Sequence, residues 1–169
     1  MIQRLLLILL FFAQVSNSIA QTFEEKNFRR YTVKQGLSNN YISGIEEDSY
    51  GYMWIGTNRG LNRFDGSNFK QFLHSTEKKS FPANAIFSIE MLPNDQLAAA
   101  TDDGAQIIFT KTLERKNLDI STEDALRYWS HAVRYVSADR DGNYIVSTKT
   151  GLYIFSGPQH SRCFLFFLI

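Results

Sequence analysis

A segment of 17 residues occurs three times in this chain without gaps, and this repeat constrains the fold more than any other feature. The copies are residues 45–61, 89–105 and 136–152. Each copy carries a threonine followed three residues later by a glycine, and successive glycines (60, 104, 151) are 44 and then 47 residues apart. A period of this size indicates an architecture in which each copy is one supersecondary unit.

Each copy has the pattern of short strands separated by turns. An apolar residue, Ile45, Ile89 or Val136, lies on the first strand, and a polar turn follows it. The second strands are predicted at 52–57, 96–101 and 143–148, and the third at 61–65, 105–109 and 152–155. A two-residue turn that ends in the repeated glycine joins them, and the first copy shows a fourth strand at 69–73.

Four antiparallel strands in about 40 to 50 residues, repeated, are typical of a propeller blade. The alternative is a β-sandwich, which also has short strands at even spacing but does not explain an ungapped threefold match. We therefore predict an all-β fold, an incomplete β-propeller of about three four-stranded antiparallel blades. The predicted blades are residues 37–80, 81–127 and 128–157, with the third incomplete.

The segments before and after the repeats also bear on the predicted propeller. Residues 28–33, within the segment 21–36, resemble 68–73, which predicts an N-terminal strand that would act as the closing fourth strand of another blade. Residues 158–169 end in seven apolar residues, too few to span a membrane, and fit no predicted blade position. We interpret this tail as the end of an interrupted reading frame and the chain as a fragment. Three blades leave open edges, so self-association is expected.

The first 20 residues have the layout of a secretory signal peptide. Arg4 precedes a run of nine apolar residues, and Ser18-Ile19-Ala20 has small residues at its first and third positions. A membrane anchor is the alternative, but nine residues at ~1.5 Å rise do not cross a hydrocarbon core of ~30 Å. We therefore expect an exported, periplasmic protein that begins at residue 21, whose parent is anchored by a later segment.

The charge balance and the cysteine content limit the possible partners and cross-links. The chain has 18 Lys plus Arg against 17 Asp plus Glu and no basic block, so we expect no nucleic-acid partner. Cys163 is the single cysteine, so an internal disulfide is excluded and burial must stabilise the fold.

The motifs that could carry chemistry have simpler explanations. The stretch from Gly56 to Gly60 could cradle a phosphate, but the alternation that follows predicts a strand where such a site needs a helix. Residues 139–143 are similar to a calcium loop but lack its glycine and glutamate at the required positions. The three histidines have no ligand spacing, and the acids at 46–48 are interpreted as solvated turn residues. We predict no catalytic residues, no metal and no cofactor.

Four segments of the first copy resemble the two-component regulator propeller repeat. They are 36–42 (GLSNNYI), 45–48 (IEED), 51–57 (GYMWIGT) and 60–65 (GLNRFD). The resemblance covers residues 28–155 but weakens in the second copy, where Ala98 stands in place of Trp54 and Asp95 in place of the turn glycine. It implies a periplasmic sensor of the hybrid two-component regulators best known from Bacteroidetes, many of which are thought to bind oligosaccharides from glycan breakdown. Longer members carry further blades and a histidine kinase module, which this sequence lacks. The remaining blades, and a second copy of the parent, are the expected protein partners.

Blade topology predicts where a ligand would bind. The connection into each first strand and the turn between second and third strands lie at one end of a blade, and polar side chains that suit a sugar gather there. The candidates are Asn39, Asn40, Asn58 and Arg59 of the first unit, Asn84, Asp102 and Asp103 of the second, and Trp129, His131 and Lys149 of the third.

The function expected from the sequence is ligand recognition for two-component signalling. One alternative is a glycan hydrolase or lyase built on a propeller, and another is a truncated product without function.

Overall fold

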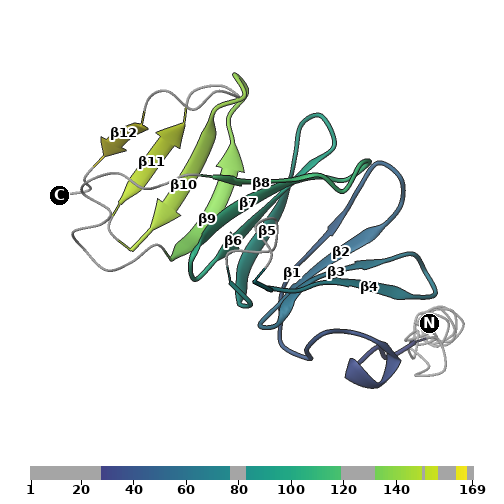
Figure 1. Ribbon diagram of the computed structural model, residues 1–169. Helices are drawn as coiled ribbons and strands as arrows, with labels where there is room; N and C mark the ends of the chain where they lie inside the picture. Colours follow the sequence, from purple (N-terminus) through teal and green to yellow (C-terminus); the bar gives the residue numbers. More distant parts are fainter. Residues whose placement is uncertain (1–27, 77–82, 119–131, 150, 156–162, 167–169) are drawn as a thin grey trace, which may run out of the picture. The chain divides into compact units, whose positions relative to one another are not determined.

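The computed structural model describes residues 28–76, 83–118, 132–149, 151–155 and 163–166 (Figure 1). The chain divides into two compact units, Met1–Arg30 and Tyr31–Ile169. In the first unit, the described residues 28–30 have no regular secondary structure. The described part of the second unit forms three antiparallel sheets of four strands each.

The three sheets have the same internal order, in which each strand pairs with the next one along the chain. The first contains β1 (Ile42–Glu47), β2 (Met53–Thr57), β3 (Gly60–Phe64) and β4 (Phe69–Phe72). The second contains β5 (Ile86–Leu92), β6 (Gln96–Thr101), β7 (Gly104–Phe109) and β8 (Arg115–Leu118). The third contains β9 (Val133–Ala138), β10 (Tyr144–Thr148), β11 (Leu152–Phe155) and β12 (Cys163–Phe166). These sheets are blades 1, 2 and 3, and they confirm the predicted fold class.

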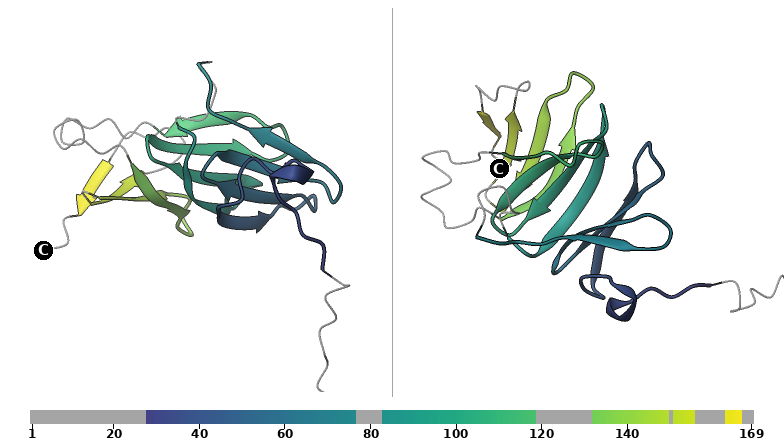
Figure 2. Two further views of the ribbon diagram at one scale, coloured as in Figure 1. Left: turned by 90° about the horizontal axis from the view of Figure 1, so that it is seen from below. Right: turned by 45° about the vertical axis from the view of Figure 1, so that its right-hand side comes forward.

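Neighbouring blades pack through their inner strands. β5 contacts β1 and β2 of blade 1, and β9 contacts β5 and β6 of blade 2. Figure 2 shows from two further directions that blade 2 lies between the other two. One apolar cluster, which includes Trp54, Ile89 and Leu97, lies between blades 1 and 2. A second, which includes Ala98, Val136 and Tyr153, lies between blades 2 and 3. Trp54 is therefore a core residue between blades, as its mid-strand position predicts.

The repeated threonine and glycine close the same hairpin in every blade. The Thr57 hydroxyl donates a hydrogen bond of 2.8 Å to the Gly60 carbonyl and accepts one of 3.0 Å from the Arg59 N–H. The Thr101 hydroxyl bonds the Gly104 carbonyl at 2.8 Å, and the Thr148 hydroxyl bonds the Gly151 carbonyl. This shared turn is the physical reason why the two residue types recur at a constant spacing.

A second feature recurs in each blade: a β-bulge near the start of the inner strand. The register between the inner strand and its neighbour skips one residue, which is Ser43 in β1, Phe87 in β5 and Arg134 in β9. The three residues occupy the same position of the repeat, two before Ile45, Ile89 and Val136. A bulge changes the direction in which a side chain points and is frequent next to functional sites.

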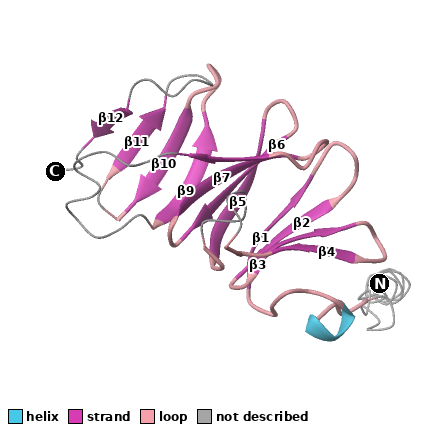
Figure 3. Ribbon diagram, viewed as in Figure 1, coloured by secondary structure: helices cyan, strands magenta, loops and turns pink. Residues whose placement is uncertain are grey.

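The predicted N-terminal strand at 28–33 is wrong. Residues 28–32 form no strand, and Val33–Gln35 form a 3-10 helix (Figure 3). Thr32 and Gln35 form a capping box: the Thr32 hydroxyl accepts from the Lys34 N–H, and the Gln35 amide oxygen accepts from the Thr32 N–H at 2.9 Å. Threonine followed three residues later by glutamine is the sequence signature of this cap, and these local bonds take the place of strand pairing.

The interpretation of residues 158–169 as a tail outside any blade is also wrong. Cys163–Phe166 form β12, which pairs with β11 in antiparallel register from Leu152↔Phe166 to Phe155↔Cys163. Blade 3 therefore has four strands and is not incomplete. The apolar run was not predicted as a strand because it lacks the alternation of a strand with one solvated face. A strand can nevertheless form there, because pairing at the edge of a sheet requires only a free row of N–H and C=O groups.

Candidate functional site

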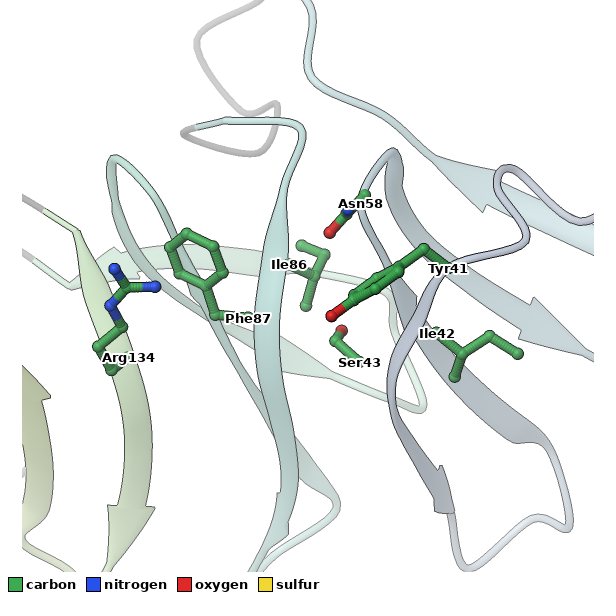
Figure 4. Close-up of a pocket in the computed structure, with 7 residues that line it drawn as sticks. All are labelled: Tyr41, Ile42, Ser43, Asn58, Ile86, Phe87 and Arg134. Carbon is green, nitrogen blue, oxygen red and sulfur yellow. The ribbon is translucent and has the colours of Figure 1, made fainter.

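The three bulge residues line one pocket. Ser43, Phe87 and Arg134 surround a cavity of about 480 Å³ together with Tyr41, Ile42, Asn58 and Ile86 (Figure 4). Blades 1, 2 and 3 each contribute to it, always from the beginning of the inner strand or from the turn beside it. Its volume lies within the range of ~300 to 1,000 Å³ that is usual for small-ligand sites.

Arg134 and Phe87 form the side of the pocket contributed by blades 2 and 3. The guanidinium carbon of Arg134 lies 4.4 Å from the centre of the Phe87 ring, which is a cation–π contact. The guanidinium is planar and keeps its charge at any physiological pH. Stacking on Phe87 therefore holds a permanent cation at the pocket, and Figure 4 shows the two side chains together.

Blade 1 supplies the opposite side. The Tyr41 side chain is 65% exposed, and its phenol ring offers a free apolar face. The Asn39 side-chain oxygen accepts a hydrogen bond of 2.7 Å from the Tyr41 N–H, and the Tyr41 carbonyl accepts one of 3.3 Å from the Asn58 N–H. The Ser43 hydroxyl is buried and has no hydrogen-bond partner among the described residues. An amide, an orphaned hydroxyl and an aromatic face thus meet in one place.

The residues predicted at the rim divide into two groups. Asn58 lines the pocket. Asn39 and Asn40 instead shape the loop before β1, because their side-chain oxygens accept from the Tyr41 and Val33 N–H groups. Asn84 does not line the pocket, but its backbone carbonyl accepts a hydrogen bond of 2.6 Å from the Gly60 N–H. That bond joins a turn of blade 1 to the loop before β5, so these two connections do lie at the same end.

The other predicted residues are not brought to the pocket. Arg59, Asp102, Asp103 and Lys149 are exposed at the turns between second and third strands and are absent from its lining. Trp129 and His131 lie outside the described residues.

Sequence reasoning missed Tyr41 and the three bulge residues. The bulge itself leaves no mark in the sequence, but extending the ungapped alignment two residues toward the N-terminus places Ser43, Phe87 and Arg134 in one column. The signal that could have found them is a column whose residues differ in chemistry directly after a column that is apolar in all three copies.

No acidic side chain lines the pocket among the described residues, although one, Glu90, lies further along β5. Glu90 is the residue after Ile89, and its carboxylate accepts a hydrogen bond of 2.8 Å from the Ser137 hydroxyl of blade 3. A hydrogen bond to Glu90, burial and the Glu90 charge together raise the pKa of the Tyr135 phenol. Glu90 therefore connects blades 2 and 3 through Oε1, while its Oε2 has no hydrogen-bond partner among the described residues.

No group of three metal-ligating side chains is found in the parts of the chain that the structure describes. Over the same residues, no helix has the length and apolarity that crossing a membrane requires. The described residues that line the pocket offer one cation, hydrogen-bonding groups and aromatic faces. These groups can bind and orient a ligand.

Three four-stranded blades that pack through their inner strands define an open β-propeller. Residues 36–59 match the family model described as "Two component regulator propeller", which confirms the resemblance seen in the sequence. The matched segment contains all four described lining residues of blade 1, which are Tyr41, Ile42, Ser43 and Asn58.

A curated relative supports the same family. The chain is 42% identical over 50 residues to "Histidine kinase P4" of Formosa agariphila, a match that covers 30% of this chain and 4% of the relative. This chain therefore spans a small fraction of the length of that protein.

Solved structures share the fold. The extracellular domain of a protein from B. thetaiotaomicron described as a hybrid two-component system has a TM-score of 0.68 and 23% identity, over 78% of this chain and 19% of that one. A second, described as a one-component system from the same organism, has a TM-score of 0.63 and 21% identity, over 79% of this chain and 20% of that one. Virginiamycin B lyase from Staphylococcus aureus has a TM-score of 0.57 and 12% identity, over 85% and 46%. At these identities the likeness concerns the fold.

Proposed function

We propose that this chain is the exported, ligand-sensing region of a two-component regulator and that its pocket recognises an oligosaccharide derived from a glycan. The observation that carries the proposal is the meeting of three bulge residues, one from each blade, with the exposed ring of Tyr41. A sugar ring needs an apolar face to stack on and hydrogen-bonding groups around its edge. Tyr41 offers the first, and Asn58 and Ser43 offer the second.

The experiment is calorimetric titration of the purified full chain with a panel of glycan-derived oligosaccharides. Saturable binding that Tyr41→Ala weakens by about tenfold or more is expected, because a stacked aromatic contact is worth ~1 kcal/mol or more beyond the area that it buries. Asp102→Ala is the matched control, since Asp102 is an exposed turn residue outside the pocket. Binding that is unchanged in Tyr41→Ala would contradict the assignment of the pocket.

A propeller enzyme acting on glycans is the second candidate, because the fold is also found in an enzyme, virginiamycin B lyase. The same oligosaccharides, incubated with the protein and separated by chromatography, distinguish the two. Sensing predicts that the sugars are recovered intact, whereas the appearance of shorter or unsaturated products would favour the enzyme.

Further blades of a parent sensor are the protein partners that we propose. Ile86 and Ile89 of blade 2 pack against blade 1, where a Cβ added to Gly44 or Gly56 would come within 2.9 Å of them. The equivalent residues of blade 1, Ile42 and Ile45, are exposed. The repeat therefore indicates what fits this face: a blade that presents small residues at the positions of Gly44 and Gly56.

A further inference from the structure

We infer that the pocket selects acidic oligosaccharides and that Arg134 recognises their carboxylate or sulfate groups. This inference rests on the proposed oligosaccharide site and adds the chemical class of the ligand. It assigns to Arg134 the role of a specificity-determining residue, which neither its place in the repeat nor its exposure alone would indicate.

The first support is the way in which Arg134 is held. As the bulge residue of β9 it is released from the regular register, and its guanidinium lies 4.4 Å from the centre of the Phe87 ring. Stacking occupies one face of the guanidinium, while its N–H groups point outward in the plane of the group. This edge matches a carboxylate or sulfate, which accepts two parallel hydrogen bonds from it. Because the ring already restricts the side chain, less conformational freedom is lost when an anion binds.

The second support is the charge of the lining. Arg134 is the charged residue of the pocket, and no acidic side chain lines it among the described residues. The Glu90 carboxylate accepts from Ser137 through Oε1, its Oε2 has no hydrogen-bond partner among the described residues, and Arg134 stacks on Phe87. A neutral sugar offers the guanidinium only hydroxyl and ether oxygens, whereas an acidic sugar offers a charged group that accepts two parallel hydrogen bonds.

The third support is the set of donors that faces Arg134 across the pocket. The side-chain amide of Asn58 can donate hydrogen bonds to a ligand, and the buried, unpartnered hydroxyl of Ser43 also lies on blade 1. An extended ligand that reaches from Tyr41 to Arg134 would therefore stack at one end and place its acidic group at the other. Figure 4 shows the Tyr41 and Arg134 side chains on opposite sides of Ile86.

The test compares three oligosaccharides of equal length by calorimetric titration of the full chain. They are a uronic-acid oligomer, its carboxyl-reduced neutral form, and the sulfate ester of that neutral form. We expect an acidic oligomer to bind about fivefold more tightly than the neutral one, because an ion pair at an exposed arginine is worth up to about 1 kcal/mol. The advantage should shrink between 20 and 200 mM salt, because salt screens an exposed charge. Whether the carboxylate or the sulfate form binds more tightly identifies the natural acidic group.

Arg134→Gln should bring the acidic and neutral oligomers to equal affinity, and Arg134→Lys should keep part of the preference. Arg140→Gln is the matched control, because Arg140 is an exposed arginine of the β9–β10 turn outside the pocket. Arg134 is exposed, so its replacement leaves the core intact, and unchanged thermal unfolding verifies this.

The outcomes separate the two proposals. If the neutral and acidic oligomers bind equally and Tyr41→Ala weakens both, the inference about Arg134 is overturned and the oligosaccharide site stands. If no oligosaccharide of the panel binds, the proposed function itself is overturned. If inorganic sulfate alone binds as tightly as the acidic oligomers, the pocket is a simple anion site and the inference is again overturned.

Discussion

The carboxylate of Asp48 accepts a hydrogen bond of 2.7 Å from the indole N–H of Trp54, and both side chains are buried. The same carboxylate accepts from the N–H groups of Tyr50 and Tyr52, each at 3.0 Å. Asp48 was interpreted as a solvated acid of the turn, and that interpretation is wrong. It connects the β1–β2 turn to the core between blades 1 and 2.

Replacing Asp48 by alanine should lower the free energy of unfolding by about 3 kcal/mol, because a buried indole N–H would lose its acceptor and the turn would lose two bonds to a charged group. Urea denaturation monitored by tryptophan fluorescence measures this. Trp54→Phe, combined with Asp48→Ala in a double-mutant cycle, isolates the bond to the indole. Equal stability of the wild type and Asp48→Ala would show that water satisfies these groups.

Gly60 is restricted in two ways, and the chain contains a control that separates them. Its φ is +92°, and an added Cβ would lie 2.5 Å from the Phe72 carbonyl oxygen. Gly66 has a φ of +93° but no atom within 4 Å of such a Cβ. Gly66→Ala should therefore cost about 1 to 2 kcal/mol, the backbone cost alone, and Gly60→Ala should cost clearly more. Chemical denaturation of both variants measures the difference, and equal losses would mean that β4 moves aside freely.

Much of the fold follows from local signals that the sequence carries. The Thr–Gly hairpins were predicted because their two residues recur at one spacing, and β6 was predicted with its observed bounds. β8 was missed because Arg115–Leu118 has no alternating pattern, and the strand forms by pairing with β7. Pairing between strands is a tertiary effect, which local propensity describes poorly.

The site was less predictable than the fold. Topology predicts the turn that holds Asn58, which lines the pocket, whereas Arg134 was not predicted, because a bulge decides where its side chain points. A bulge depends on the register of two strands. The strand register depends on which face of the strand is buried in the folded protein. The positions of polar residues in turns, from which the site was predicted, do not reveal it.

Stability in acid should depend on the turn of blade 3. The side chain and the N–H of Asn143, followed by the Asp141 N–H, donate to Asp139 and hold the pKa of its carboxyl below the ordinary value of 3.8. A lowered pKa contributes stability that is present above pH ~3.8 and is lost as the pH falls through the folded-state pKa. The stability difference between wild type and Asp139→Asn should therefore shrink below about pH 4. Unfolding free energies measured from pH 7 to pH 3 test this, and a difference that stays constant across that range would contradict it.

The exposed face of blade 1 should make the protein self-associate. Ile45 is 54% exposed, whereas its equivalent Ile89 is only 6% exposed because blade 1 covers it. Burying such a side chain gains about 1.5 to 3 kcal/mol, which favours contact with another sheet. Analytical ultracentrifugation of the wild type should show association that increases with concentration, and Ile45→Lys should reduce it. Val33→Lys is the matched control, because Val33 is similarly exposed but lies on the 3-10 helix. A wild-type protein that remains monomeric at every concentration, or an equal effect of both lysines, would show that this face does not attract a second sheet.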